Sequence, residues 1–224
     1  DIIHIKFKYY KVNKMSNEHW LIEELEQHLK EKKEAKFSAE QKKVIEYFTN
    51  NYAKEKIQNL SLEKYTNIFD KNKPSETEYL CHFLEITSSV FGSSRPGNAT
   101  QFGIYKRKDQ KQGEYYFPNN SDNKPADTYF NDKIRPILES LCKEINGNLE
   151  DSLVKIFNND EDSPIQAKQC LLKFVYLNNM DKLINIYRKE TLQAIGTALG
   201  LDQERIKSDS ILELNYAISK EIIR

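Results

Sequence analysis

The stretch that decides the fold class is QFGIYKRKDQKQGEYYF, residues 101–117. Residues 101–106 alternate apolar and polar side chains, residues 108–113 form a polar turn that ends in glycine, and residues 114–117 form a second, aromatic segment. Two such segments on either side of a polar turn are typical of a β-hairpin. We therefore predict a small antiparallel hairpin or sheet around residues 101–118.

The sequence on both sides of this hairpin is typical of amphipathic helices. Before it, apolar residues recur at helical spacing after a Ser38 cap and again over residues 75–91, where Gly92 ends the pattern. After it, helical patterns are predicted over residues 126–145, 149–157, 165–177, 183–186, 189–199 and 210–223, and Pro136 predicts either a kink or a break in the first of these. The predicted fold class is α+β, mostly helical, with one small sheet.

The length of 224 residues suits one large domain. Residues 1–14 alternate apolar and basic side chains, and a fresh cap-like sequence starts at Met15, so we predict an N-terminal extension over residues 1–15. Residues 16–224 are predicted to form a single mostly helical domain. The acidic loop near residues 158–164 is its one candidate internal boundary.

The composition indicates a soluble folded protein. Apolar residues make up 38% of the chain, which is enough for a core, while 30% charged residues and a mean hydropathy of -0.74 require wide polar helix faces. The sequence has no uncharged apolar run of about 18 residues and no signal-peptide pattern. We therefore predict a cytoplasmic protein without a membrane partner.

Charge excludes a strongly basic nucleic-acid-binding domain. The chain has 34 basic and 34 acidic residues, and the first half is only slightly more basic than the second. Proteins that bind mainly through phosphate neutralisation are usually more basic. Any nucleic-acid role must therefore depend on a local patch.

Neither the cysteines nor the histidines predict a metal or cofactor site. The cysteines are Cys81, Cys142 and Cys170, and the histidines are His4, His19, His28 and His82. There is no CxxC pair and no HxxxH or HExxH spacing. The three cysteines lie in apolar helical contexts, so we predict buried free thiols.

Catalytic motifs are also missing from the sequence. Gly92 and Gly97 have the spacing of a phosphate-binding loop, but no Lys follows, and the preceding segment is predicted to be a helix. The acid-x-Lys sequence at residues 109–111 lies in the predicted turn, where its usual role is to keep the turn soluble. A nuclease is therefore the least favoured alternative, and we predict that this chain is not an enzyme.

The hairpin combines basic and aromatic side chains. Its candidate DNA-binding residues are Arg95, Lys106, Arg107, Lys108, Lys111, Tyr105, Tyr115 and Tyr116. Basic groups at phosphates beside aromatic faces that stack on bases are typical of single-strand or flipped-base binding. The alternative is that Phe102 and Ile104 pack inward while the charges only keep the turn soluble.

The same region resembles the N-terminal regions of McrB-like AAA+ proteins. The resemblance lies in Leu62-Glu-Lys-Tyr-Thr, Phe83-Leu-Glu-Ile-Thr, Gly92-Ser93, Gly97 and Phe102-Gly103-Ile104-Tyr105, and extends over about residues 60–200. Gly92, Gly97, Phe102 and Gly103 would form its structural motif. This sequence departs from the pattern at Pro96 and Asn98, which flank a single glycine, and at Gln101, where the family often has Lys.

The resemblance implies a role in a modified-DNA restriction system of antiviral defence. In such systems an N-terminal specificity domain binds DNA, sometimes with a modified cytosine, an AAA+ motor hydrolyses GTP, and a separate nuclease subunit cuts. The motor motifs are absent from these residues, so the resemblance implies a non-catalytic DNA-recognition module. The alternative is a protein-interaction or scaffolding domain of a defence ATPase, which the neutral charge and high tyrosine content also suit.

Overall fold

The structure, a computed structural model, describes residues 37–94, 99–106, 115–117, 125–158 and 163–222. Within these ranges the chain is mostly helical, and β1 (Tyr105–Lys106) and β2 (Tyr115–Tyr116) form a two-stranded antiparallel sheet. The predicted α+β class is therefore confirmed. The predicted extension at residues 1–15 lies outside the described residues. No helix in the described ranges has both the length and the apolar character needed to span a membrane.

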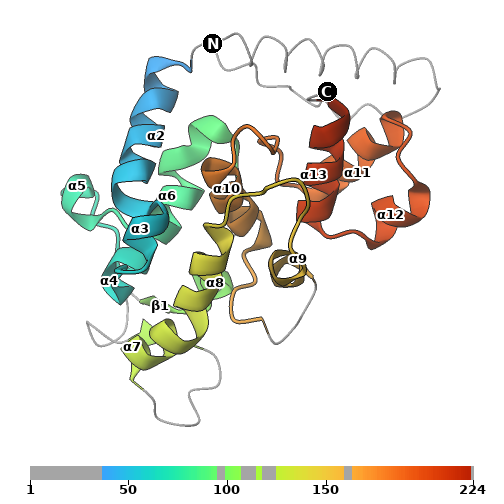
Figure 1. The fold of residues 1–224 in the computed structure, drawn as a ribbon. Coiled ribbons are helices and arrows are strands. Elements are labelled where there is room, and N and C mark those ends of the chain that lie inside the picture. Colours follow the sequence, from blue (N-terminus) through green and yellow to red (C-terminus); the bar gives the residue numbers. More distant parts are fainter. Residues whose placement is uncertain (1–36, 95–98, 107–114, 118–124, 159–162, 223–224) are drawn as a thin grey trace.

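The helices before the hairpin form one side of the molecule (Figure 1). They are α2 (Ala39–Tyr52), α3 (Lys54–Ile57), α4 (Leu62–Tyr65), α5 (Pro74–Thr77), α6 (Leu80–Glu85) and the 3-10 helix η1 (Thr87–Phe91). Helix α2 starts at a capping box, in which Ser38 Oγ accepts a bond from the Gln41 amide and the Gln41 side chain accepts one from the Ser38 amide. These two bonds provide acceptors for amide groups that would otherwise have no hydrogen-bond partner at the start of the helix.

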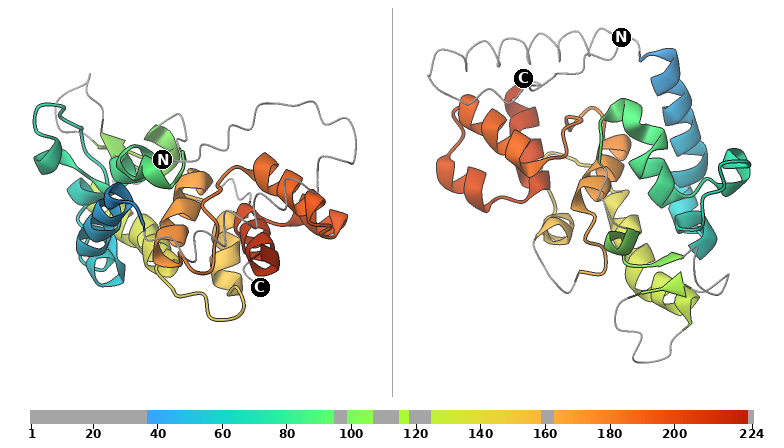
Figure 2. Two further views of the ribbon diagram at one scale, coloured as in Figure 1. Left: turned by 90° about the horizontal axis from the view of Figure 1, so that it is seen from above. Right: turned by 180° about the vertical axis from the view of Figure 1, so that it is seen from behind.

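The elements that follow these helices complete the core. They are η2 (Ala99–Phe102), α7 (Ala126–Tyr129), the π-helical turn η4 (Phe130–Ile134), α8 (Arg135–Leu141), α9 (Asp151–Phe157), α10 (Lys168–Asn178), α11 (Lys189–Ala198), α12 (Gln203–Ser208) and α13 (Ile211–Ile222). Figure 2 shows α11, α12 and α13 on the side of the molecule opposite α2.

Helix α10 lies at the centre of the core. Every residue from Cys170 to Leu177 is buried, and the helix contacts α6, α8 and α13. A helix with apolar residues on all sides is stable only when other elements cover it completely. Helix α10 therefore connects the early helices with the last ones.

The predicted helix over residues 75–91 is wrong as one continuous element. The chain leaves the helical conformation at Glu78 and Tyr79, which are extended, and turns again at Ile86. Ile86 and Thr87 are β-branched and two serines follow, which lowers the helix propensity of this end of the segment. The segment is therefore divided into α5, α6 and η1, and Gly92 ends the last of these at a φ of 101°.

The predicted strand over residues 101–106 is also too long. Gln101 and Phe102 belong to η2, and Gly103 turns the chain with a φ of 81°, so that only Tyr105 and Lys106 pair with β2. The physical reason is a competing partner, because the Gln101 carbonyl accepts bonds from the amides of Gln166 and Ala167. The backbone of this segment pairs with the chain before α10 and not with a second strand.

Pro136 does not break the helical segment from residue 126 to residue 141. The chain passes through the wide turn η4, in which the Arg135 amide bonds to the Phe130 carbonyl, and Pro136 lies in the first turn of α8. A wide turn just before a proline accommodates the missing amide donor. Of the two predicted outcomes, a continuous but distorted helix is the one that the structure has.

Candidate nucleic-acid interface

Four predicted site residues form two cross-strand pairs in the hairpin. Tyr105 lies opposite Tyr116, and Lys106 lies opposite Tyr115. The rings of Tyr105 and Tyr116 are stacked, with centroids 5.8 Å apart and planes inclined by 26°. Both rings are only partly buried. This pair offers aromatic surface at the strand ends nearest the core.

Lys106 and Tyr115 interact directly. The ammonium nitrogen of Lys106 lies 5.1 Å from the centre of the Tyr115 ring, a cation–π contact. The Tyr115 hydroxyl is buried, and no described residue forms a hydrogen bond with it. Burial, aided by the carboxylates of Glu63 and Asp127, raises the pKa of Tyr115 to about 12. Tyr115 therefore stays neutral at physiological pH.

Three sets of contacts fix the hairpin to the core. The Tyr65 hydroxyl donates a 2.7 Å bond to the Phe102 carbonyl, and Phe117 stacks on Tyr129 of α7 with centroids 4.7 Å apart. Phe102 and Ile104 are buried, as the alternative interpretation of the hairpin predicted. The base of the hairpin is thus rigid, and the paired side chains of β1 and β2 are held in place by it.

The predicted glycine motif has a structural role where it is described. A Cβ at Gly92 would lie 3.1 Å from the Asn185 carbonyl oxygen and 3.2 Å from the Tyr187 ring. A Cβ at Gly103 would lie 2.1 Å from the Pro164 carbonyl oxygen. Both glycines allow other parts of this chain to come close. Of the remaining site residues, Arg95, Gly97, Arg107, Lys108 and Lys111 lie outside the described residues.

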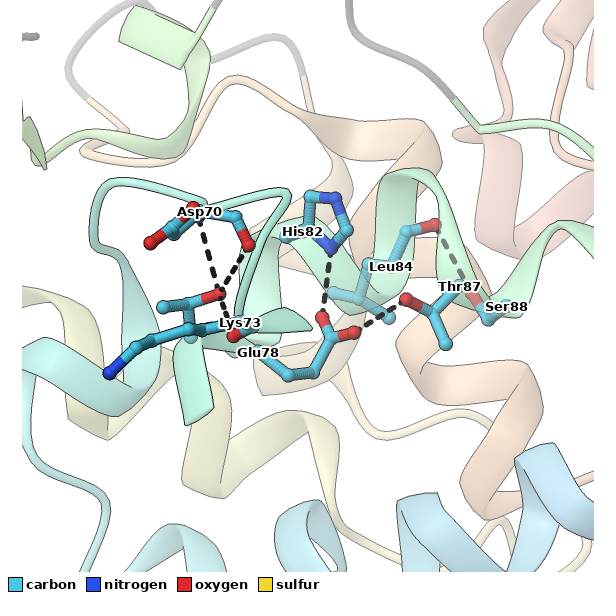
Figure 3. Close-up of polar contacts among 8 residues, drawn as sticks. Asp70, Lys73, Glu78, His82, Leu84, Thr87 and Ser88 are labelled. Carbon is cyan, nitrogen blue, oxygen red and sulfur yellow. Dashed lines mark hydrogen bonds and ion pairs between the residues drawn. The ribbon is translucent and has the colours of Figure 1, made fainter. Parts of the chain in front are cut away.

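A second polar cluster was not predicted from the sequence. The Glu78 carboxylate lies 2.9 Å from His82 Nδ1 and accepts a 2.7 Å bond from the Thr87 hydroxyl (Figure 3). The Phe69 ring stacks on the His82 imidazole with centroids 3.9 Å apart. Glu78 and His82 are four residues apart, a spacing that signals a helical pair. Here Glu78 precedes the helix, so the cluster connects three segments across the break.

The cysteines and acidic residues add no metal site within the described ranges. Cys81, Cys142 and Cys170 are free and buried, as predicted. Burial raises the pKa of Cys142 and of Cys170 to about 12, so neither thiol is reactive in the closed fold. No group of three or more His, Cys, Asp or Glu side chains in the described part of the chain could hold a metal ion.

A groove of about 630 Å³ lies between α9 and α13. Its charged lining residues are Lys155, Arg205, Lys220, Asp151, Glu213 and Glu221, and Tyr216 supplies an aromatic face. The groove therefore has as many positive as negative side chains.

Comparison of the chain with models of protein families, with curated proteins and with solved structures gave no match. The resemblance to McrB-like regions stays a prediction.

Proposed function

We propose that this chain is a non-catalytic DNA-recognition module that binds through the β1–β2 hairpin. The observation that supports the proposal most is the stacked, partly exposed pair of Tyr105 and Tyr116 beside Lys106. A tyrosine ring that is held on a rigid base can stack on a nucleobase with little loss of side-chain freedom. Tyr115 is already covered on one face by Lys106, so its role in the proposal is to hold that lysine.

Phosphate contacts would come from Lys106 and from the basic side chains in the adjoining sequence. Residues 107–114, which connect the two strands, include Arg107, Lys108 and Lys111. Each lysine or arginine that neutralises a phosphate releases a counterion, so binding weakens as salt rises. Because the chain has no net charge, its affinity for DNA would come from the basic residues of this hairpin and not from an overall positive charge.

The wider setting of the proposal comes from the sequence resemblance. A McrB-like restriction system would supply an AAA+ motor and a nuclease subunit as partners, and this chain would supply DNA specificity. The glycines that support the resemblance allow close packing within this chain at residues 92 and 103. They are therefore compatible with a common fold and add nothing to the argument for DNA contact.

The test is fluorescence polarisation of the purified chain with labelled duplexes and single strands. The duplexes are unmodified, methylated and hydroxymethylated, and each is titrated at two or more salt concentrations. We expect affinity to fall as salt rises. The triple variant K106A/R107A/K108A should bind at least about tenfold more weakly, with a salt slope reduced by roughly 2 to 3. A preference among the duplexes would assign the specificity.

Two further variants separate stacking from charge. Y116A removes one ring of the partly exposed pair and should weaken binding without changing the salt slope. K155A removes an exposed lysine of α9 and leaves the hairpin intact, so it should bind like the wild type. Binding that is absent at low salt, or that K155A reduces as much as the triple variant does, would exclude the hairpin as the DNA site.

The second candidate function is a protein-interaction module. The groove between α9 and α13 favours it, because balanced charges around an aromatic face suit a protein partner better than a polyanion. A pull-down with the AAA+ motor and the nuclease subunit of a McrB-like system, using the wild type and an R205E/K220E variant, tests it. Retention that is lost in the variant would support this function.

A further inference from the structure

Lys173 is a lysine in the middle of the core. It lies on α10 with none of its surface exposed to solvent. Its ammonium nitrogen donates a 2.9 Å hydrogen bond to the Leu84 carbonyl and lies 5.6 Å from the centre of the Tyr187 ring. Within the described residues no carboxylate forms an ion pair with it. A lone buried cation of this kind is costly, because it loses its hydration.

The lysine belongs to a cluster that joins three segments. The Leu84 carbonyl also accepts bonds from the hydroxyls of Ser88, at 3.2 Å, and Ser94, at 2.9 Å. The bond from Ser88 is visible in Figure 3. The Cys170 thiol in turn donates a 2.7 Å bond to the Ser94 carbonyl. The C-terminal end of α6, the segment of residues 92–94 and the middle of α10 therefore meet at one carbonyl oxygen, that of Leu84.

Within the described residues, the titratable groups that act on Lys173 come from α6, from α10 itself and from the chain before α11. They are Glu85 from α6, Cys170 from α10 itself and Tyr187 from the chain before α11. Burial lowers the pKa of Lys173 to about 8, and the negative charges that Cys170 and Glu85 can carry oppose this shift. Burial raises the pKa of Cys170 and of Tyr187, so both stay neutral below about pH 10. Lys173 is thus the cluster member that changes charge near pH 8 in the closed fold.

We propose that Lys173 is a pH-sensitive latch, which holds the segment of residues 92–94 firmly against α6 and α10 when its amine is neutral and lets the segment open when its amine is protonated. In the closed state the ammonium has one hydrogen-bond acceptor and one aromatic face, whereas in the open state water solvates it fully. The neutral amine keeps an N–H for the Leu84 carbonyl, so deprotonation does not break the cluster.

The direction of the pH dependence follows from linkage. The folded pKa of Lys173 is below the ordinary value of 10.5, so its closed state favours the neutral amine. Its stabilising contribution is complete above pH 10.5 and is lost as the pH falls through about 8. Between these limits opening takes up as much as one proton, and the open fraction should fall by up to about tenfold for each unit of rising pH.

Alkylation of Cys170 reports this opening, because its thiol is bonded to Ser94 and is covered when the segment is closed. The full chain is treated with iodoacetamide from pH 7 to 10, at reagent concentrations where the rate is proportional to reagent. Modification of each cysteine is resolved by peptide mass spectrometry. Each rate is divided by that of the same cysteine in urea at the same pH, which removes the intrinsic pH dependence of the thiolate.

We expect the protection of Cys170 to rise about 40-fold from pH 8 to pH 10, because both ends of this range lie near a pKa of Lys173. Cys142, which lies at the end of α8, should not follow this rise. K173M should abolish the rise at Cys170, because Ser88 and Ser94 still satisfy the Leu84 carbonyl while the titrating group is gone. K155M removes an exposed lysine and should behave like the wild type.

Three outcomes would overturn the latch. The first is a protection of Cys170 that does not change with pH, and the second is a rise that persists in K173M. The third is an equal rise at Cys142, which would assign the effect to global unfolding. Circular dichroism checks that K173M is folded. If it is not, the comparison of Cys170 with Cys142 in the wild type decides the question without the variant.

Discussion

Gly103 and Pro164 are packed so closely that a single added carbon would not fit between them. A Cβ at Gly103 would lie 2.1 Å from the Pro164 carbonyl oxygen, well inside van der Waals contact. Gly103 also has a φ of 81°, a region that other residues rarely adopt. This contact joins the turn before β1 to the segment before α10, and so fixes where the hairpin starts.

We expect G103A to destabilise the fold by more than about 3 kcal/mol, since it combines left-handed strain of about 1 kcal/mol with a backbone clash. The matched control is G147A, because Gly147 has almost the same φ of 84° but no atom within 4 Å of its Cβ position. G147A should cost only about 1 kcal/mol. Urea unfolding followed by circular dichroism measures both. Equal costs would show that the contact with Pro164 is not tight in solution.

We expect Y65F to destabilise the fold by about 1 to 3 kcal/mol, because it leaves the buried Phe102 carbonyl without its donor. The same variant should weaken DNA binding, since the Tyr65 bond holds the base of the hairpin. Y216F is the comparison, because the Tyr216 hydroxyl bonds to the Gly147 carbonyl at the surface, where water can replace it. Thermal unfolding that ranks Y216F at or below Y65F in stability would contradict this role for Tyr65.

Asn215 satisfies three backbone groups at once. Its side chain accepts a bond from the Ile184 amide and donates to the carbonyls of Ile184 and Ile186. We expect N215A to cost about 3 kcal/mol or more in unfolding free energy, because these buried groups lose their partners. Among the described residues, Asn178 bonds with its side chain to the Phe174 carbonyl alone, within its own helix, and so gives the control N178A, with a cost below about 1 kcal/mol.

N215D sharpens the same prediction through its pH dependence. A buried carboxylate can accept the Ile184 bond but cannot donate to either carbonyl, and its pKa should be raised by burial. A raised pKa means that the stability present below about pH 4 is lost as the pH rises. Unfolding curves at several pH values should therefore show the deficit of N215D against wild type growing from acid to neutral pH. A deficit that is independent of pH would argue against burial of this side chain.

The Glu78 cluster predicts a coupling that a double-mutant cycle can measure. E78A removes the acceptor for both His82 and Thr87 and should cost about 1 to 2 kcal/mol, whereas T87V removes one bond and should cost about 1 kcal/mol. Because the Thr87 bond is lost in both variants, E78A/T87V should cost less than the two single costs added together. Additive costs from chemical unfolding would mean that Thr87 and Glu78 do not interact.

The hairpin was predictable in kind and not in extent. Alternation around a polar turn predicts two strands, and the structure has them, because Tyr105, Lys106, Tyr115 and Tyr116 pair in register. The strand is short because the Gln101 carbonyl bonds to amides about 65 residues further along the chain. A pattern read in a short window contains no information about such distant partners.

The site was predictable in composition and only partly in geometry. The sequence indicates aromatic and basic side chains near residue 105, but the pairing of Lys106 with the Tyr115 ring depends on the register. Lys173 was missed, although a single lysine within the apolar run of α10 is a readable signal. Helix α12 was missed as well, although Asp202 caps it by accepting a bond from the Arg205 amide.

The burial of α10 on every side has a consequence for dividing this chain into fragments. A fragment that ends before α13 would leave part of α10 uncovered, and a fragment that starts after α6 would uncover the face that carries Lys173. Either fragment would expose a hydrophobic surface of α10 to solvent, and we expect it to aggregate. A fragment that keeps α10 covered must therefore contain both α6 and α13.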